Sequence, residues 1–209
     1  MDNCIQSSAL PYHGLYIHWP WCKKKCPYCD FNSHVSQQAP TKAYVDALLL
    51  EMETASRTAT PQPLVSIFFG GGTPSLMSPH DVELLVTKAE SLFGFTPNIE
   101  ITLEANPTSS EAQKFSGFVD TGVNRFSVGM QSPEKEDLSF LGREHSADEA
   151  ILAVQAAQKA CQNVSLDLIY GLPKQDILTW EANLKTLCDL GTQHLSAYQL
   201  TIEKNTKFY

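Results

Sequence analysis

Six short runs of apolar residues are spaced along the chain, and each predicts a β-strand. The runs are rich in β-branched and aromatic residues or alternate apolar with polar positions, and glycine, proline or polar residues follow them. They span residues 14–19, 64–69, 99–104, 123–128, 164–169 and 195–201. The gaps after the first five runs are long enough for helices.

Helical periodicity fills those gaps. Apolar residues recur at helical spacing over about 41–57, from Pro79 to Leu92, from Ser109 or Ser110 to about Gly122, over 148–160 and over 177–190. Thr41 and Ser78 are suited to cap the first two helices, and Pro79 suits a first helical position. Gly191 suits the end of the last helix.

Strands that alternate with helices predict βαβ crossovers and therefore a parallel sheet. Six such units fit either an open, doubly wound α/β sheet or a partial barrel. The sequence ends just after the sixth run without a sixth helix, so we expect further barrel units or a second domain to follow in a longer protein. On this interpretation residues 1–13 form an N-terminal tail, and residues 14–209 form a core domain that is incomplete at its C-terminus.

Composition and charge narrow the classes of function. The chain has 209 residues, 43% of them hydrophobic, which is ordinary for a globular protein. Its net charge of −8 argues against nucleic acid as a partner. It has no apolar run of about 18 residues and no signal-peptide pattern, so we expect no transmembrane segment and a cytoplasmic location. The six cysteines are then expected to be thiols or metal ligands rather than disulfides.

Unusual residues gather where the predicted strands end. In parallel α/β folds the functional groups sit at the C-terminal ends of the strands. The segments in question are the cysteines within 22–29, the glycines of 70–74, and residues 104–107, 129–132 and 167–173. Their convergence predicts one site at this end of the sheet.

Three cysteines in the first segment have the spacing of ligands. Cys22, Cys26 and Cys29 form the pattern C-x3-C-x2-C, which lets three thiolates face a common point. Cysteine thiolates hold iron–sulfur clusters, and three protein ligands on a four-iron cluster would leave one iron open for a substrate or cofactor. The alternatives are a zinc site completed by His18 or His34, and three unrelated thiols. Zinc sites commonly use two CxxC pairs, and this sequence has no second pair.

Glycines and carboxylates supply the rest of the predicted site. The glycines of 70–72 let the backbone approach a ligand closely, although a tight turn would use the same residues. Glu104 ends an alternating strand, where its carboxylate can accept hydrogen bonds from a ligand amine. Asp167 lies between two leucines of an apolar run and needs a partner, for which Arg143 and a ligand are the candidates. A structural salt bridge would explain Asp167 equally well.

Taken together, the motifs resemble a known family. The cysteine pattern, with Tyr28 before its last cysteine, resembles the signature of radical S-adenosylmethionine (radical SAM) proteins. Residues 70–74 (GGGTP) resemble that family's motif for the methionine amino group. Further segments resemble oxygen-independent coproporphyrinogen III oxidase and its relatives, so that the resemblance covers about residues 14–203. These segments are 16–22 (YIHWPWC), 29–32 (CDFN), 103–107 (LEANP), 122–129 (GVNRFSVG), 141–143 (LGR) and 167–173 (DLIYGLP).

The resemblance implies the fold and the cofactors. It favours an α/β partial (βα)6 TIM-like barrel, open at one side and followed by a C-terminal domain, over the open sheet. Cys22, Cys26 and Cys29 would hold a [4Fe-4S] cluster whose fourth iron binds S-adenosylmethionine, and one electron from the cluster would release a 5′-deoxyadenosyl radical. The residues that the resemblance implies for binding S-adenosylmethionine are Tyr16, Tyr28, Gly71, Gly72, Thr73, Glu104, Gln131, Arg143, Asp167 and Thr201.

One position separates two branches of this family. The oxidases carry a further cysteine two residues after the third ligand, and this sequence has Phe31 there. Residues 29–32 and 195–203 instead look like the heme-chaperone branch, whose members bind heme and pass it to acceptor proteins. We therefore expect a heme chaperone that binds the cluster, S-adenosylmethionine and heme. The alternative is an oxidase that decarboxylates porphyrinogen propionates. The family also suggests peripheral association with a membrane, and no histidine is singled out as a heme ligand.

Overall fold

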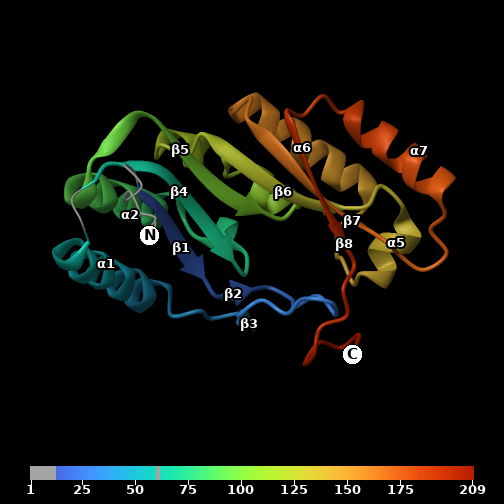
Figure 1. Ribbon diagram of the computed structural model, residues 1–209, viewed down its shortest axis with the longest axis horizontal. Helices are drawn as coiled ribbons and strands as arrows, with labels where there is room; N and C mark the ends of the chain where they lie inside the picture. The colour runs from blue at the N-terminus through green and yellow to red at the C-terminus, as the bar shows by residue number, and fades with distance from the viewer. Residues whose placement is uncertain (1–12, 60–61) are drawn as a thin grey trace, which may run out of the picture.

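The computed structural model describes residues 13–59 and 62–209, so the predicted tail lies outside the described residues except for His13. Strands and helices alternate along the chain (Figure 1). The long strands are β1 (His13–Trp19), β4 (Leu64–Gly71), β5 (Phe95–Ala105), β6 (Arg125–Gln131), β7 (Val164–Tyr170) and β8 (His194–Gln199). Each overlaps one predicted run. Two short strands that the sequence did not indicate, β2 (Trp21–Cys22) and β3 (His34–Val35), pair with each other on either side of the stretch that carries Cys26 and Cys29.

The helices lie between these strands in the chain. They are α1 (Thr41–Thr58), α2 (Pro79–Phe93), α3 (Ser109–Ala112), α4 (Phe115–Asp120), α5 (Lys135–Phe140), α6 (Ala147–Ala160) and α7 (Ile177–Cys188), with a 3-10 helix, η1 (Pro74–Leu76), before α2. No helix in the described part of the chain is both long and apolar enough to cross a membrane.

The order of the strands decides between the two predicted architectures. The six long strands form one sheet in the order β1-β4-β5-β6-β7-β8, and every pair is parallel. A doubly wound sheet reverses its strand order and so places helices on both faces. Here the order never reverses, so the crossovers place the helices on one face and the sheet curves away from them. The fold is therefore the predicted partial barrel, in which β1 and β8 pair with one neighbour each.

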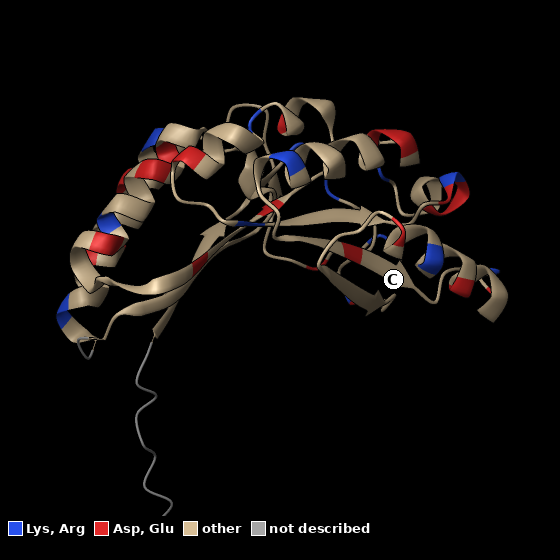
Figure 2. Cartoon of the chain, turned by 90° about the horizontal axis from the view of Figure 1, so that it is seen from above, with Lys and Arg blue, Asp and Glu red and all other residues tan. Residues whose placement is uncertain are grey.

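Alternate residues of each strand face the helices and form the core. Figure 2 shows the helices on the outer side of the curved sheet, where they carry many charged residues. The outward-facing strand residues are buried and apolar: Ile17 and Trp19, Ile67 and Phe69, Ile101 and Leu103, Phe126 and Val128, Leu166 and Leu168. Each fully buried side chain of this size contributes about 1.5–3 kcal/mol through the hydrophobic effect.

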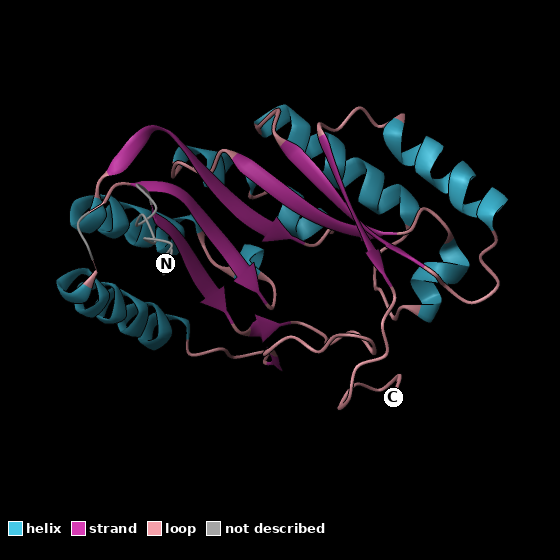
Figure 3. Ribbon diagram, in the orientation of Figure 1, coloured by secondary structure: helices cyan, strands magenta, loops and turns pink. Residues whose placement is uncertain are grey.

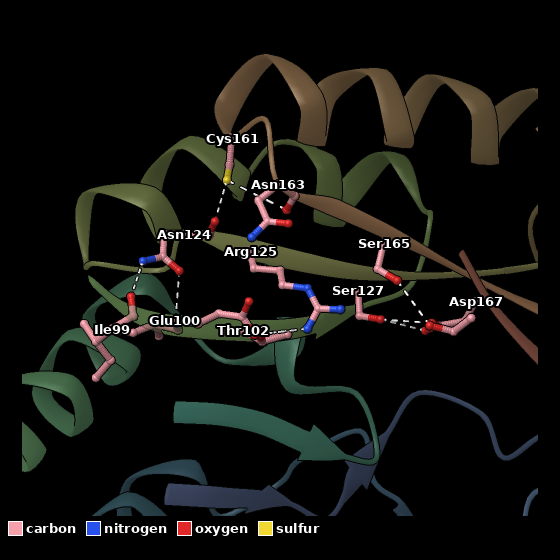
Figure 4. A network of polar contacts seen from close by, with 12 residues as sticks. Ile99, Glu100, Thr102, Asn124, Arg125, Ser127, Cys161, Asn163, Ser165 and Asp167 are labelled. Atoms are coloured by element: carbon pink, nitrogen blue, oxygen red, sulfur yellow. Dashed lines mark hydrogen bonds and ion pairs between the residues drawn. The ribbon is translucent and has the colours of Figure 1, made fainter. Parts of the chain in front are cut away.

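The other alternate positions face the inside of the barrel, and several of them are polar. Figure 4 shows Thr102 of β5, Arg125 and Ser127 of β6, and Ser165 and Asp167 of β7 near one another. The Arg125 guanidinium donates to the Glu100 carboxylate at 3.2 Å. The barrel interior thus provides polar groups directly below the C-terminal ends of the strands.

The first helix begins differently from the prediction, whereas the second begins as predicted. Thr41 is the first residue of α1 rather than its cap, and its hydroxyl donates to the Ala39 carbonyl at 3.4 Å. Ser78 does cap α2, because its hydroxyl accepts from the Asp81 N–H at 3.1 Å, and the Asp81 carboxylate accepts from the Ser78 N–H at 3.3 Å. This reciprocal pair is a capping box.

Three further boundaries correct the prediction. The single helix expected from Ser109 or Ser110 to Gly122 is two short helices, α3 and α4. Glu111 and Lys114, on either side of the break, both form hydrogen bonds with Ser75 of η1. The sixth strand ends at Gln199, so Thr201 lies after β8 and not within it. Helix α5 was not predicted, because its six residues are too few for a periodic signal.

Candidate functional site

A cavity of about 310 Å³ lies at the C-terminal ends of the strands. Figure 3 shows the strand arrowheads pointing to this end, where the loops after β1 and β8 also lie. All predicted site residues except Tyr16 line the cavity. The convergence that the sequence predicted is therefore observed, and the cavity is within the usual size range for small-ligand sites.

Tyr16 is the predicted residue that lies apart from the cavity wall. It is 56% exposed on β1, and its hydroxyl lies 2.9 Å from the Nδ1 atom of His18. Its ring stacks on Phe68 with the centroids 6.3 Å apart. A contact between Tyr16 and a cofactor stays a prediction.

The cysteine segment folds into a compact loop beside the cavity. Cys22, Cys26 and Cys29 are free thiols, and a turn forms where the Cys29 N–H donates to the Cys26 carbonyl at 3.2 Å. The Lys25 ammonium donates to the carbonyls of Phe31 at 2.9 Å and Ser33 at 3.1 Å, which ties the loop together. Within residues 13–59 and 62–209, no three His, Cys, Asp or Glu side chains stand close enough to hold a single metal ion.

The glycine segment packs directly against this loop. The Gly72 N–H donates to the Trp19 carbonyl at 2.6 Å, and the Thr73 N–H donates to the Trp21 carbonyl at 2.9 Å. A Cβ atom on Gly72 would lie 2.6 Å from the Trp21 oxygen and 3.0 Å from the Cys22 sulfur. Glycine is therefore required because the two loops touch, which brings the first cysteine next to a backbone that lines the cavity.

Glu104 presents a carboxylate to the cavity, as predicted from its place at a strand end. Its Oε2 atom accepts from the Gly71 N–H at 3.2 Å. Burial raises the pKa of Glu104 to about 7, the negative charge of Asp167 adds to the rise, and the hydrogen bond from Gly71 opposes it. A ligand amine that donates to this carboxylate would replace the solvation that burial removes.

Asp167 is satisfied by a residue other than the predicted one. The Ser127 hydroxyl lies 3.0 Å and 2.9 Å from its two carboxylate oxygens, and Arg143 makes no hydrogen bond to it. Burial raises the pKa of Asp167, and the hydrogen bond from Ser127 opposes that rise. Of the two predicted candidates, Arg143 is therefore not a hydrogen-bond partner of Asp167, because the strand register places Ser127 of β6 beside Asp167 of β7. The other candidate, a ligand, stays a prediction.

Arg143 instead joins three parts of the cavity wall. Its Nη2 atom donates to the Asn106 side-chain oxygen at 2.7 Å and to the Gly129 carbonyl at 2.9 Å, and its Nη1 atom lies 3.5 Å from the Cys26 sulfur. The Asn106 amide also donates to the Thr73 hydroxyl at 3.2 Å. Asn106 was not predicted as a site residue, although its place directly before a proline at a strand end was available as a signal.

Gln131 has an unusual backbone for a non-glycine residue. Its φ is 71°, in the left-handed region, at the end of β6 where the register with β7 shifts. Strain of this kind concentrates at functional sites. Lining residues that the sequence did not single out include Lys25, Ser127 and Tyr198. Each lies inside a segment that the sequence analysis quoted, but at a position to which no role was given.

The donor set of the cavity fits the cofactors that the sequence predicted. Three free thiols on one loop suit an iron–sulfur cluster, and the glycine backbone leaves no Cβ between that loop and the cavity. The half-buried carboxylates of Glu104 and Asp167 suit amine and hydroxyl donors of an organic ligand. The fold and the site thus define a class, the parallel α/β barrels with a cavity at the strand ends that is lined by three free cysteines.

Comparison with known proteins identifies the family within this class. The sequence profile of the radical SAM superfamily matches residues 16–187. The chain therefore belongs to the radical SAM superfamily. It is 43% identical over 205 residues to the heme chaperone HemW of Haemophilus influenzae, which covers 95% of this chain and 54% of that protein. The corresponding values for HemW of Escherichia coli are 42% over 201 residues, 95% and 53%.

A solved structure gives the same assignment of fold. Coproporphyrinogen III oxidase (HemN) from Escherichia coli, a radical SAM enzyme, superimposes with a TM-score of 0.82 at 28% identity. The match covers 93% of this chain and 46% of that chain. This chain spans about half the length of the curated relatives it matches.

Proposed function

We propose that this chain forms the radical SAM core of a heme chaperone, which binds a [4Fe-4S] cluster, S-adenosylmethionine and heme and delivers heme to acceptor proteins. The observation that carries the proposal is Phe31, a residue that lines the cavity where the resembling oxidases have a further cysteine. The identity of 43% to a heme chaperone, against 28% to a coproporphyrinogen III oxidase, supports the same choice.

Cys22, Cys26 and Cys29 would hold the cluster as thiolates. When bound, the cluster and S-adenosylmethionine supply one-electron cleavage of a carbon–sulfur bond. Arg143 would keep a positive charge 3.5 Å from the Cys26 sulfur, beside the cluster that this residue would help to hold.

Glu104 would accept hydrogen bonds from the amino group of S-adenosylmethionine, and Asp167 would accept from its ribose hydroxyls. Gln131 and Thr201 line the cavity at the ends of β6 and β8, where they would contact the rest of the same molecule.

Heme would need a further contact surface, and we assign no histidine to it. Both ring nitrogens of His18 are engaged, with Tyr16 at 2.9 Å and the Asn32 carbonyl at 2.8 Å. His145 is buried with Nε2 3.3 Å from the Met130 carbonyl, and burial lowers its pKa to about 4.

We infer a cytoplasmic protein with a heme-acceptor partner and peripheral association with a membrane.

The second candidate function is oxidative decarboxylation of coproporphyrinogen III. The superposition on HemN with a TM-score of 0.82 favours it, because the two barrels have the same arrangement of strands and helices over 93% of this chain. The two functions differ in the product: an oxidase releases carbon dioxide from propionate groups, whereas a chaperone returns heme unchanged.

Anaerobic reconstitution of the intact protein separates the two. Protein with a verified cluster is given S-adenosylmethionine, a reductant and coproporphyrinogen III, and the products are separated by chromatography. A parallel sample is loaded with heme and mixed with an apo heme protein, whose Soret band reports transfer. We expect transfer and no protoporphyrinogen. Protoporphyrinogen that forms with the wild type and not with Cys22→Ser would overturn the chaperone proposal in favour of the oxidase.

A further inference from the structure

Behind the cavity wall, Glu111 is a charged residue that is almost fully buried. It lies on α3 with 1% of its surface exposed. Burying a carboxylate is costly unless hydrogen bonds satisfy it, so its partners indicate what it holds. Its oxygens accept from the Ser75 hydroxyl, from the Asn106 N–H at 2.8 Å and from the Thr108 hydroxyl at 3.3 Å.

Two of these partners belong to loops that form the cavity. Ser75 lies in η1, directly after the glycine segment, and Asn106 directly follows β5. Lys114 holds the same loop from the other side, since its ammonium donates to the carbonyls of Ser75 at 3.0 Å and Met77 at 3.3 Å. Glu111 and Lys114 therefore clamp η1 against the end of β5.

Asn106, whose N–H donates to Glu111, itself lines the cavity. Its side-chain nitrogen donates to the Thr73 hydroxyl at 3.2 Å, and its side-chain oxygen accepts from Arg143 at 2.7 Å. Because a guanidinium only donates, the amide has one orientation that serves both partners. Arg143 in turn reaches the Cys26 sulfur at 3.5 Å. Asn106 thus connects the glycine segment with the cysteine loop.

We propose that Glu111 is a positioning residue for S-adenosylmethionine binding. By holding the Asn106 backbone, Glu111 fixes the position of the Asn106 side-chain amide, which joins Thr73 to Arg143. It thereby fixes the distance between the glycine segment and the cysteine loop, the two segments that would bind the cofactor. Glu111 does not line the cavity, so it must act through a residue that it holds, and of its three hydrogen-bond partners Asn106 is the one that lines the cavity. The inference rests on the proposed function, because cofactor affinity is the quantity that Glu111 would control.

A double-mutant cycle tests this route. Intact protein with a reconstituted cluster is prepared as wild type, Glu111→Leu, Asn106→Ala and the double variant. The Kd for S-adenosylmethionine is measured by equilibrium dialysis, and the cluster's electron paramagnetic resonance spectrum is recorded with and without it. Each single change should weaken binding by roughly tenfold, the scale of one or two lost hydrogen bonds. The double variant should bind no more weakly than Asn106→Ala, because residues of one network are not additive.

Two controls separate positioning from stability. Glu111→Gln keeps an oxygen that can accept from the Asn106 N–H, so it should restore affinity close to that of the wild type. Met52→Ala, a buried position on α1 that does not line the cavity, should lower the Tm and leave the Kd unchanged. Where Glu111→Leu does not fold, Glu111→Asp replaces it in the cycle, because the shorter side chain withdraws the carboxylate while keeping its charge.

The proposal is overturned if the Glu111 variant loses Tm but keeps the wild-type Kd and spectrum. It is equally overturned if the fold-increase in Kd of the double variant equals the product of the fold-increases of the two single variants. Wild-type protein with a verified cluster that does not bind S-adenosylmethionine would instead contradict the proposed function, so the two failures are distinguishable.

Discussion

The Glu104 carboxylate accepts a hydrogen bond from the Gly71 N–H at 3.2 Å, which joins the end of β5 to the glycine segment after β4. Burial and the nearby charge of Asp167 nevertheless raise the pKa of Glu104 to about 7. The site therefore keeps a carboxylate in surroundings that disfavour its charge. We therefore predict that replacing Glu104 by a neutral residue makes the protein more stable and weakens its binding of the cofactor.

Glu104→Gln should make the cofactor-free protein more stable at high pH. A carboxyl whose pKa is raised by folding binds its proton more tightly when folded, so stability falls as pH rises from the unfolded value toward 7. The amide of the variant cannot ionise, so its stability does not fall with pH for this reason. The variant's advantage should be about 1 kcal/mol at pH 5 and about 3 kcal/mol at pH 8, from the size of the pKa rise. Urea unfolding at both pH values measures it.

The same variant should bind S-adenosylmethionine more weakly at pH 8, since it loses the charged acceptor proposed for the amino group. Equal stability of the two proteins at pH 8 would contradict the raised pKa. Unchanged affinity would instead show that Glu104 does not face the cofactor's amine.

Gly72→Ala should prevent the cluster from being retained. The added methyl would lie 2.6 Å from the Trp21 oxygen and 3.0 Å from the Cys22 sulfur, so the cysteine loop must move away from the glycine segment. Iron and sulfide per protein after anaerobic reconstitution report the loss. Gly94→Ala is the matched control: its φ of +70° makes alanine cost about 1 kcal/mol, but a Cβ there meets nothing within 4 Å. That variant should keep its iron.

Lys25→Met should let a chelator remove cluster iron faster. The ammonium ties the loop by donating to the Phe31 and Ser33 carbonyls, and losing these bonds should favour loop opening by about 1 kcal/mol, or roughly fivefold. Absorbance after addition of a chelator follows the loss. Lys42→Met removes another ammonium, from an exposed pair with Asp46 on α1, and should leave the rate at the wild-type value. Identical rates in the two variants would show that Lys25 does not hold the loop.

Ser78→Ala should destabilise the fold without touching the site. It removes the side-chain half of the capping box on α2, which is worth about 0.5–2 kcal/mol. The midpoint of urea unfolding should fall while the affinity for S-adenosylmethionine stays constant. A change in affinity would indicate that α2 is coupled to the cavity through η1.

Much of the fold follows from local pattern. The six runs lie within or overlap the six long strands, because alternation and β-branched content act over a few neighbouring residues. Ser78 and Pro79 begin α2 as predicted for the same reason. The break between α3 and α4 was not predictable, since it depends on contacts of Glu111 and Lys114 with η1, more than 30 residues earlier in the chain.

The sequence by itself determined the strands, the cysteine spacing and the residues that meet at one end of the sheet, since periodicity and strand ends are local properties. Only the tertiary structure decided which of those residues are partners. The unreversed strand order chose the partial barrel, the register of β6 and β7 placed Ser127 rather than Arg143 beside Asp167, and the turn after β5 made Asn106 the link to Arg143. Each choice depends on which distant segments become neighbours, and only the assembled sheet determines that.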